Sequence, residues 1–264
     1  MTKREILHAL AHNHDDQMLL ASVLDKLEAC RIRNYTTNTY FLDMRQGALV
    51  REAVRLADGQ DRCVFWGGYA DAERVCAVFY PEYLTQDTAT DETNSPVILL
   101  RAHTRGALRH ADYLGALLGL QIERKRIGDI LPGPDGAEIL ALRELEEFLI
   151  AHFTQAGRFP VQLTRVPLGS LRRPPARESE GTGSVASLRL DSVISLIFSL
   201  PRSQAQDMVE HGLVFVNQLP VLKPGRSIEV GDRITVRGKG RAQVTSLEGV
   251  SRKGRQFIRY VRTM

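Results

Sequence analysis

The sequence predicts an α+β protein with a helical N-terminal segment, a central α+β sandwich and a C-terminal helix-turn-helix-strand domain. Up to about residue 57, apolar residues recur at helical spacing, whereas the alternation typical of strands begins near residue 62. A stretch rich in proline, glycine and serine then precedes a second amphipathic segment. The predicted parts are a helical subdomain (1–58), an α+β domain (59–166), a linker (167–186) and a C-terminal domain (187–264).

The N-terminal subdomain is expected to be mainly helical. Six apolar residues form one broad face of its long helix, namely Met18, Leu19, Ala21, Val23, Leu24 and Leu27. Residues 40–42 predict a short extended segment. Asp43 is expected to cap the next helix, because an aspartate oxygen can accept from the free N–H groups of a first turn.

The central domain combines strands with two helices. Predicted strands cover 62–66, 74–80, 97–101, 127–131, 138–142 and 161–166, and predicted helices cover 106–118 and 143–153. This order predicts a sheet with one face covered by helices and the other face free for a ligand. The prolines, glycines and arginines of 167–186 predict a linker, with Val185 and Leu188 placed to cover the edge of the following domain.

The C-terminal domain begins with a one-sided apolar pattern that predicts a helix, carried by Leu190, Val193, Ile194, Ile197 and Phe198. Pro201 is expected to end this helix. Ser203 is expected to cap a second helix with Gln206 as its capping-box partner, and Gly212 to end it in a left-handed conformation. Alternating residues then predict strands at 214–216 and 234–237.

Positive charge is concentrated in this last domain. The whole chain has a net charge of +4, but residues 187–264 hold 13 Lys and Arg against 6 Asp and Glu, a net of +7, and the first 186 residues have −3. Ten of the 13 cations are arginines, whose planar guanidinium suits bidentate phosphate contacts. The pattern indicates a nucleic-acid surface, with a solvated basic face as the alternative.

The same segment resembles the S-four RNA-binding domain, or alpha-L motif. The resemblance is carried by Arg189-Leu190-Asp191, Arg202-Ser203, Gly212 to Asn217 and Gly231-Asp232, and Pro201 stands where the family usually has serine. It implies that the helical turn binds structured RNA through its shape and phosphates. The candidate RNA-binding residues here are Arg189, Arg202, Ser203, Asn217, Lys223, Arg237, Lys239 and Arg241.

A second basic patch surrounds residues 101–130. Its candidate RNA-binding residues are Arg105, Arg109, Arg124, Lys125 and Arg126, close to a helix with small residues at Ala111, Gly115, Ala116 and Gly119. Together with Phe65-Trp66-Gly67-Gly68-Tyr69, this stretch resembles the YlmH family over nearly the whole chain. That resemblance implies a ribonucleoprotein-like α+β sandwich, and binding to the large ribosomal subunit and tRNA in rescue or quality control of stalled translation.

Two other classes of function stay open. An RNA-modifying enzyme, of the pseudouridine synthase or methyltransferase type, would use Asp112 and Asp129, although pairing with neighbouring arginines explains both acids more simply. A protein-interaction adaptor would direct the basic surfaces at acidic protein. Among the aromatics Phe65, Trp66 and Tyr69, at least two are expected to pack against the sheet and one to stack on an unpaired base.

Several features are predicted to be absent. No GxGxxG or Walker motif indicates a nucleotide or methyl-donor site, so we expect no cofactor and no catalysis. His8 and His12 share a helix face without a metal-binding motif, so no metal is expected. Cys30, Cys63 and Cys76 show no CxxC spacing and predict free thiols, although Cys63 and Cys76 can face one another across a hairpin. We expect a cytoplasmic monomer without a membrane segment.

Overall fold

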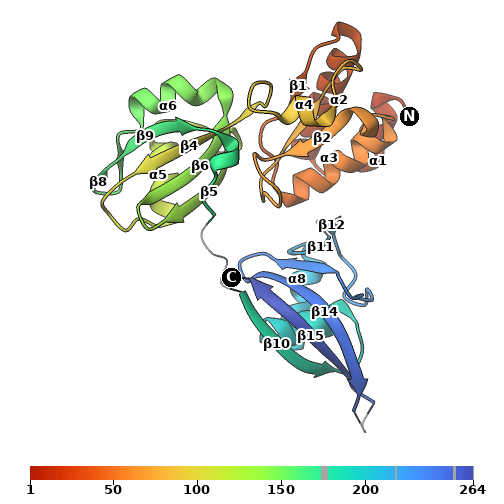
Figure 1. Ribbon diagram of the computed structural model, residues 1–264. Helices are drawn as coiled ribbons and strands as arrows, with labels where there is room; N and C mark the ends of the chain where they lie inside the picture. The colour runs from red at the N-terminus through yellow and green to blue at the C-terminus, as the bar shows by residue number, and fades with distance from the viewer. Residues whose placement is uncertain (174–177, 218, 252–253, 264) are drawn as a thin grey trace. The chain divides into compact units, whose positions relative to one another are not determined.

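The computed structural model describes residues 1–173, 178–217, 219–251 and 254–263, which form two units, Met1–Pro174 and Pro175–Met264 (Figure 1). Unit 1 contains the helices α1 (Lys3–Leu10), α2 (His14–Arg33), α3 (Met44–Leu56), α4 (Gln86–Thr90), α5 (His110–Gly119) and α6 (Glu146–His152). Its strands are β1 (Thr37–Asn38), β2 (Cys63–Trp66), β3 (Cys76–Phe79), β4 (Val97–His103), β5 (Ile127–Gly133), β6 (Gly136–Leu142), β7 (Gln155–Ala156), β8 (Phe159–Pro160) and β9 (Gln162–Val166).

The first three helices begin at side-chain caps. Thr2, Asn13 and Asp43 each accept a hydrogen bond from a backbone N–H in the first turn that follows, and the predicted cap at Asp43 is confirmed by a 2.8 Å bond from Gln46 N. The helices enclose a hydrophobic cluster that also includes Ala77 and Phe79 of β3. The strands β2 and β3 therefore share a core with the N-terminal helices.

These strands form a three-stranded antiparallel sheet in the order β1-β3-β2. The strand β3 pairs with β2 on one side and on the other with the two-residue strand β1, which lies between α2 and α3 in the sequence. The predicted domain boundary at residue 58 thus cuts through one packed layer. The prediction missed this pairing because β1 is too short for hydrophobic periodicity to reveal.

The central sheet has the order β5-β6-β4-β9 and is buried on both faces. In β4, Ile98 and Leu100 pack with α5 and α6, whereas Val97 and Leu99 pack in a second cluster with Phe41 and residues of β2 and β3. The prediction of one free sheet face is therefore wrong. The four consecutive apolar residues at the start of β4 are what a strand buried on both sides requires.

Unit 2 contains α7 (Leu190–Ile197), α8 (Arg202–Glu210) and the strands β10 (Glu178–Val185), β11 (Val214–Val216), β12 (Leu219–Pro220), β13 (Arg233–Val236), β14 (Gly240–Val250) and β15 (Gln256–Thr263). The sheet has the order β10-β15-β14-β13-β11-β12. Apolar residues from both helices and five of the strands form its core. The predicted helix pair and the strands after it are present.

Part of the predicted linker is a strand. All eight residues of β10 pair with β15. Its glycines are required by packing, because a Cβ at Gly181 would lie 2.5 Å from the Tyr260 ring and one at Gly183 2.7 Å from Leu196. A composition typical of linkers here permits close contact with bulky neighbours.

The turn between α7 and α8 also differs from its predicted form. Pro201 is the N-cap of α8 and makes no side-chain capping bond, so Ser203 lies inside the helix. Without a cap at Ser203 there is no capping box, and the Gln206 amide binds Asp191 instead. Gly212 has φ of +68°, which confirms the predicted left-handed end of α8.

The three cysteines are free. Cys63 pairs with Phe79 and Cys76 with Trp66, so the two cysteines do not face one another across the β2–β3 pair. Burial raises the pKa of the Cys63 thiol to about 12. Within the described residues, no helix is long and apolar enough to span a membrane, and no three metal-binding side chains cluster.

Candidate nucleic-acid interface

The α7–α8 turn is organised around the carboxylate of Asp191, which is fully buried. Arg189 donates from Nε and Nη2 at 3.1 Å each, and Arg202 from the same two atoms at 3.3 and 3.2 Å. Gln206 Nε2 and Ser192 N donate at 3.0 and 2.9 Å. Six N–H groups therefore bind one carboxylate and fix both arginines at the start of their helices.

Electrostatics keep Asp191 ionised. Burial acts to raise the pKa of its carboxyl, but hydrogen bonds from Arg189 and Gln206 and the charges of Arg202 and Arg189 outweigh that effect and lower the pKa to about 2. The two arginine side chains remain 43% and 54% exposed. A guanidinium has five N–H donors, and Arg189 and Arg202 each use two of them on Asp191. Both side chains can therefore still donate to a phosphate.

Three further candidates, Lys223, Arg237 and Lys239, lie on the surface of unit 2. Each has an exposed side chain, and within the described part of the chain none makes a hydrogen bond or ion pair through its charged group. Lys239 lies in the turn between β13 and β14, directly after Arg237 and Gly238. Arg241 is less exposed and lies on β14, opposite Thr235 and Thr263 of the adjacent strands.

Asn217 and Ser203 have different surroundings from those of the cations. Asn217 has φ of +52°, its Nδ2 donates to Asp232 Oδ1 at 2.7 Å and its Oδ1 accepts from Arg233 N at 3.0 Å. Its amide therefore holds the ends of β11 and β13 together. Ser203 is exposed on the first turn of α8, next to Arg202.

The basic candidates of unit 1 fall into two groups. Arg105 and Arg109 are exposed between β4 and α5, and the Arg109 side chain is 87% exposed even though its Nε lies 3.8 Å from Asp112 Oδ2. By contrast, Arg124, Lys125 and Arg126 form a short 3-10 turn before β5, where Lys125 pairs with a glutamate at 2.8 Å and Arg126 with another at 2.7 Å. Intramolecular pairing therefore reduces the free charge of the predicted second patch.

The three aromatics predicted as stacking candidates all have partners inside the protein. The guanidinium of Arg51 lies 3.8 Å from the Phe65 ring centroid, Trp66 Nε1 donates to Ser95 Oγ at 3.1 Å, and Tyr69 OH donates to Asp129 at 2.8 Å. A more exposed aromatic in the same unit is Tyr40, at 43%. In the sequence, Tyr40 begins the predicted short extended segment and is followed by Phe41, which is buried in the structure.

Asp129 and Asp112, the two acids that the alternative enzymatic interpretation would use, have separate structural roles. Asp129 is 8% exposed and accepts from Tyr69 OH, Glu73 N and Arg74 N, which ties the segment before β3 to β5. Burial raises the pKa of Asp129, and these hydrogen bonds oppose the rise. Asp112 accepts from Arg109 N at 2.8 Å and so stabilises the start of α5.

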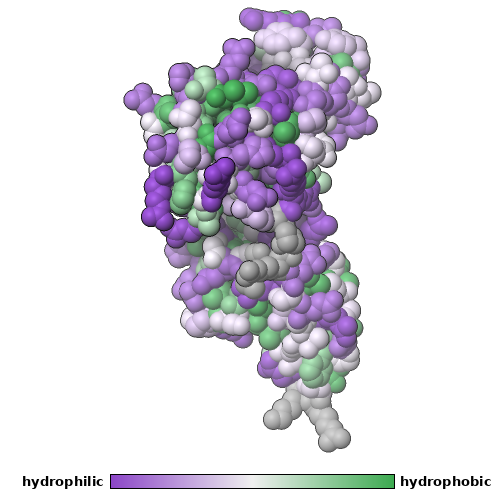
Figure 2. Space-filling view, turned by 60° about the vertical axis from the view of Figure 1, so that its left-hand side comes forward, coloured by the Kyte–Doolittle hydropathy of each residue, from purple (hydrophilic) through white to green (hydrophobic). Residues whose placement is uncertain are grey.

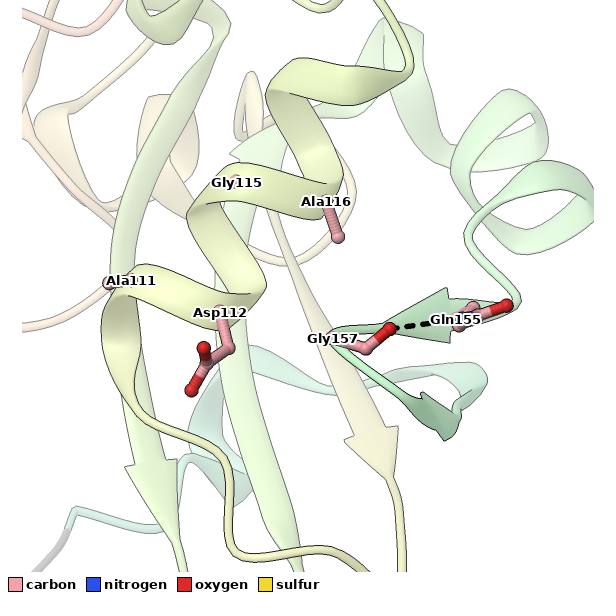
Figure 3. Close-up of a pocket in the computed structure, with 6 residues that line it drawn as sticks. All are labelled: Ala111, Asp112, Gly115, Ala116, Gln155 and Gly157. Carbon is pink, nitrogen blue, oxygen red and sulfur yellow. Dashed lines mark hydrogen bonds between the residues drawn. The ribbon is translucent and has the colours of Figure 1, made fainter.

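Asp112 also lines an open hollow of about 450 Å³ between α5 and the β7–β8 pair (Figure 3). Figure 3 shows Asp112 on the first turn of α5, while Gln155 and Gly157 come from the facing hairpin and share a 2.9 Å hydrogen bond. The other lining residues are Ala111, Gly115 and Ala116. Asp112 is the one ionisable group among these six, so the hollow has no second group for acid–base catalysis.

Hydrophilic side chains cover most of the face of unit 1 seen in Figure 2, with smaller hydrophobic patches between them. Such a surface suits contacts with a polar, charged ligand better than burial against an apolar one.

Comparison with known proteins identifies the family. A family model described as "S4 domain" matches residues 188–234, and one described as "Putative RNA-binding domain in YlmH" matches residues 104–170. The chain is 31% identical over 224 residues to "Ribosome-associated protein quality control protein P2" of Bacillus subtilis, covering 85% of this chain and 86% of that protein. The chain belongs to the YlmH family. The predicted resemblance is confirmed, and the chain carries two RNA-binding domains.

Two further relatives support the fold. "Cell division protein ylmH from Streptococcus pneumoniae" matches with a TM-score of 0.50 and 20% identity, over 60% of this chain and 94% of that one. "Small ribosomal subunit protein uS4" of Kosmotoga olearia is 38% identical over 80 residues, which are 28% of this chain and 38% of that protein. The S4 match ends within β13, so β10, β14 and β15 lie outside it.

Proposed function

We propose that this protein binds structured ribosomal RNA and tRNA on the large ribosomal subunit, and acts without catalysis in rescue or quality control of stalled translation in the cytoplasm. The name of the Bacillus subtilis relative and the two RNA-binding domains support this. The observation that carries the proposal is the pair Arg189 and Arg202, held half-exposed by buried Asp191 within the S4 domain.

The geometry fits recognition by shape. A-form RNA presents phosphates across grooves whose base edges are poorly accessible, and fixed guanidiniums can bind two phosphate oxygens at once. Lys223, Arg237 and Lys239 are exposed charges whose side chains hold no local structure together, and we expect them to add phosphate contacts. Affinity is therefore expected to depend strongly on salt and weakly on sequence.

The choice of substitutions follows from the Asp191 network. Changing Arg189 or Arg202 leaves a buried carboxylate short of partners, so lost binding could reflect lost structure. Arg237→Glu combined with Lys239→Glu avoids this. A matched control is Arg4→Glu combined with Arg33→Glu, which changes charge equally at two exposed positions of unit 1.

Gradient co-sedimentation with separated ribosomal subunits and stalled complexes tests the proposal. The wild type is expected with the large subunit, the Arg237→Glu/Lys239→Glu protein is expected to dissociate at lower salt, and the control is expected to behave as wild type. In filter binding to ribosomal RNA, the dependence of log affinity on log salt is expected to become less steep by about two in the Arg237→Glu/Lys239→Glu protein. Absence of wild-type protein from the large subunit in all complexes contradicts the proposal.

A further inference from the structure

Tyr40 is an exposed aromatic ring on a firmly anchored backbone. It lies between Thr39 and Phe41, which are 4% and 1% exposed, while Tyr40 itself is 43% exposed. Phe41 N donates to Lys125 O at 2.8 Å, and Phe41 O accepts from Arg74 Nη2 at 3.1 Å. The ring is therefore presented at the surface by a segment whose neighbours are fixed in the core.

A cation lies on this ring. Lys125 Nζ is 4.8 Å from the Tyr40 ring centroid, and the Lys125 side chain is 47% exposed. Its ion pair with Glu123, at 2.8 Å, is exposed on both sides. An exposed ammonium–ring contact is weaker than the stacking of a nucleobase on tyrosine. A base can therefore replace the ammonium on the ring and leave Lys125 to bind a phosphate.

The neighbouring cation, Arg124, binds backbone carbonyl groups. Its Nη1 donates to the carbonyl oxygens of Ile127 and Gly128, and among the described residues it makes no ion pair with a carboxylate. Burial and the nearby charge of Arg74 lower the pKa of Arg124 to about 10, and the charge of Asp129 opposes them. A partly buried guanidinium that faces carbonyl groups and a second cation gains stability when an anion binds.

We propose that Tyr40, Lys125 and Arg124 form a binding site for an unpaired RNA nucleotide, with the base stacked on Tyr40 and the phosphate between the two cations. The ligand class rests on the proposed function, but this surface belongs to unit 1, whereas the Arg189–Arg202 turn belongs to unit 2. It also explains why the basic 3-10 turn lies against an exposed tyrosine. Stacking tolerates any base, so the site selects unpaired nucleotides rather than a sequence.

Fluorescence anisotropy with the full-length protein tests the site. The probes are a labelled oligouridylate of about 12 nucleotides and a blunt RNA duplex of equal length. Tyr40→Ala is expected to weaken oligouridylate binding about tenfold and duplex binding less than about twofold, since only the first offers an unpaired base. Tyr40→Phe, which keeps the ring, is expected to stay within about twofold of wild type.

Tyr83→Ala is the matched control, because Tyr83 is a second exposed tyrosine of unit 1, at 66%. It is expected to bind both probes as wild type does. The measurements are repeated in the Arg237→Glu/Lys239→Glu protein, so that RNA held by unit 2 does not mask the effect. Equal oligouridylate affinity of the Tyr40→Ala and Tyr83→Ala proteins in both backgrounds overturns the proposal.

Photo-crosslinking gives a second readout that does not depend on affinity. Oligouridylate carrying 4-thiouridine is expected to crosslink to the peptide containing Tyr40, and mass spectrometry locates the modified residue. If Tyr40 binds oligouridylate but the protein never sediments with ribosomes, the site stands and the ribosomal proposal fails. If ribosome binding is normal and Tyr40→Ala has no effect, the ribosomal proposal stands and this site is wrong.

Discussion

Asp129 of unit 1 and Asp191 of unit 2 are buried aspartates that fix the backbone around them, but the partners of the two carboxylates differ in charge. Asp191 is bound by two arginines, a glutamine and a backbone N–H. Asp129 accepts from a tyrosine hydroxyl and two backbone N–H groups. Cationic partners lower the pKa of Asp191 to about 2, whereas burial raises the pKa of Asp129.

The difference separates two ways of supporting a proposed RNA-binding surface. Around Asp191, the residues that stabilise the turn are the ones proposed to contact RNA, so structure and binding cannot be altered independently there. Around Asp129, neutral donors fix the backbone of Glu73 and Arg74, and the proposed nucleotide contacts come from other residues. Single substitutions at the proposed contact residues of unit 1 can therefore test binding without altering the aspartate network. In unit 2, the same test requires exposed cations such as Lys239.

The largest expected effect comes from removing the charge of Asp191. Asp191→Asn leaves Arg189 and Arg202 without their anion, and we expect it to cost about 3 kcal/mol, the lower end of the range for a broken buried ion pair because both arginines reach solvent. Hydrogen exchange of α7 and α8 in the full chain, combined with urea unfolding, measures the loss. The control is Asp207→Asn, an exposed acid on α8. Equal stability of these two variants contradicts the ion-pair account.

Acid is expected to affect the Asp191 and Asp129 sites in opposite directions. Because the folded pKa of Asp191 lies near 2, below its ordinary 3.8, its contribution is present above about pH 4 and is lost as pH falls toward 2. The loss amounts to about 2 kcal/mol. The folded pKa of Asp129 is raised, so its contribution is present at low pH and is lost as pH rises through that pKa.

Hydrogen exchange at pH 3 and pH 5, corrected for intrinsic rates, distinguishes the two sites. Protection of α7 is expected to fall at pH 3, while protection of Glu73 and Arg74 is expected to hold. Asp191→Asn should abolish the acid-dependent part of the change in unit 2. A loss of protection confined to Glu73 and Arg74 at pH 3 reverses the predicted order and contradicts the comparison.

Local rules of sequence predicted much of the fold, because they depend on neighbours along the chain. The Asp43 cap, the left-handed Gly212 and the α7–α8 helix pair are examples. Features set by distant contacts were missed. The glycines of β10 matter only through Tyr260 and Leu196, and the second buried face of β4 depends on β2 and β3.

The candidate sites show the same limit. Counting charges located the basic regions but not their partners, since Arg126 pairs with Glu144, which lies 18 positions away in sequence. Likewise, Arg189 and Arg202 were identified as surface cations without the prediction that Asp191 is fully buried between them. Whether an aromatic is exposed also depends on tertiary packing, which is why Tyr40 was not selected from the sequence.

The smallest expected effect concerns Asp129. In Asp129→Asn, an amide oxygen in the place of Oδ2 still accepts from Tyr69 OH and Glu73 N, whereas the new NH2 group faces the N–H of Arg74 and that hydrogen bond is lost. The neutral amide also removes the cost of burying a charge. We therefore expect a loss of about 1–2 kcal/mol by urea unfolding, smaller than that of Asp191→Asn, with oligouridylate binding unchanged. A cost equal to that of Asp191→Asn would show that hydrogen-bond number, rather than the charge of the partners, determines how strongly each buried aspartate stabilises its unit.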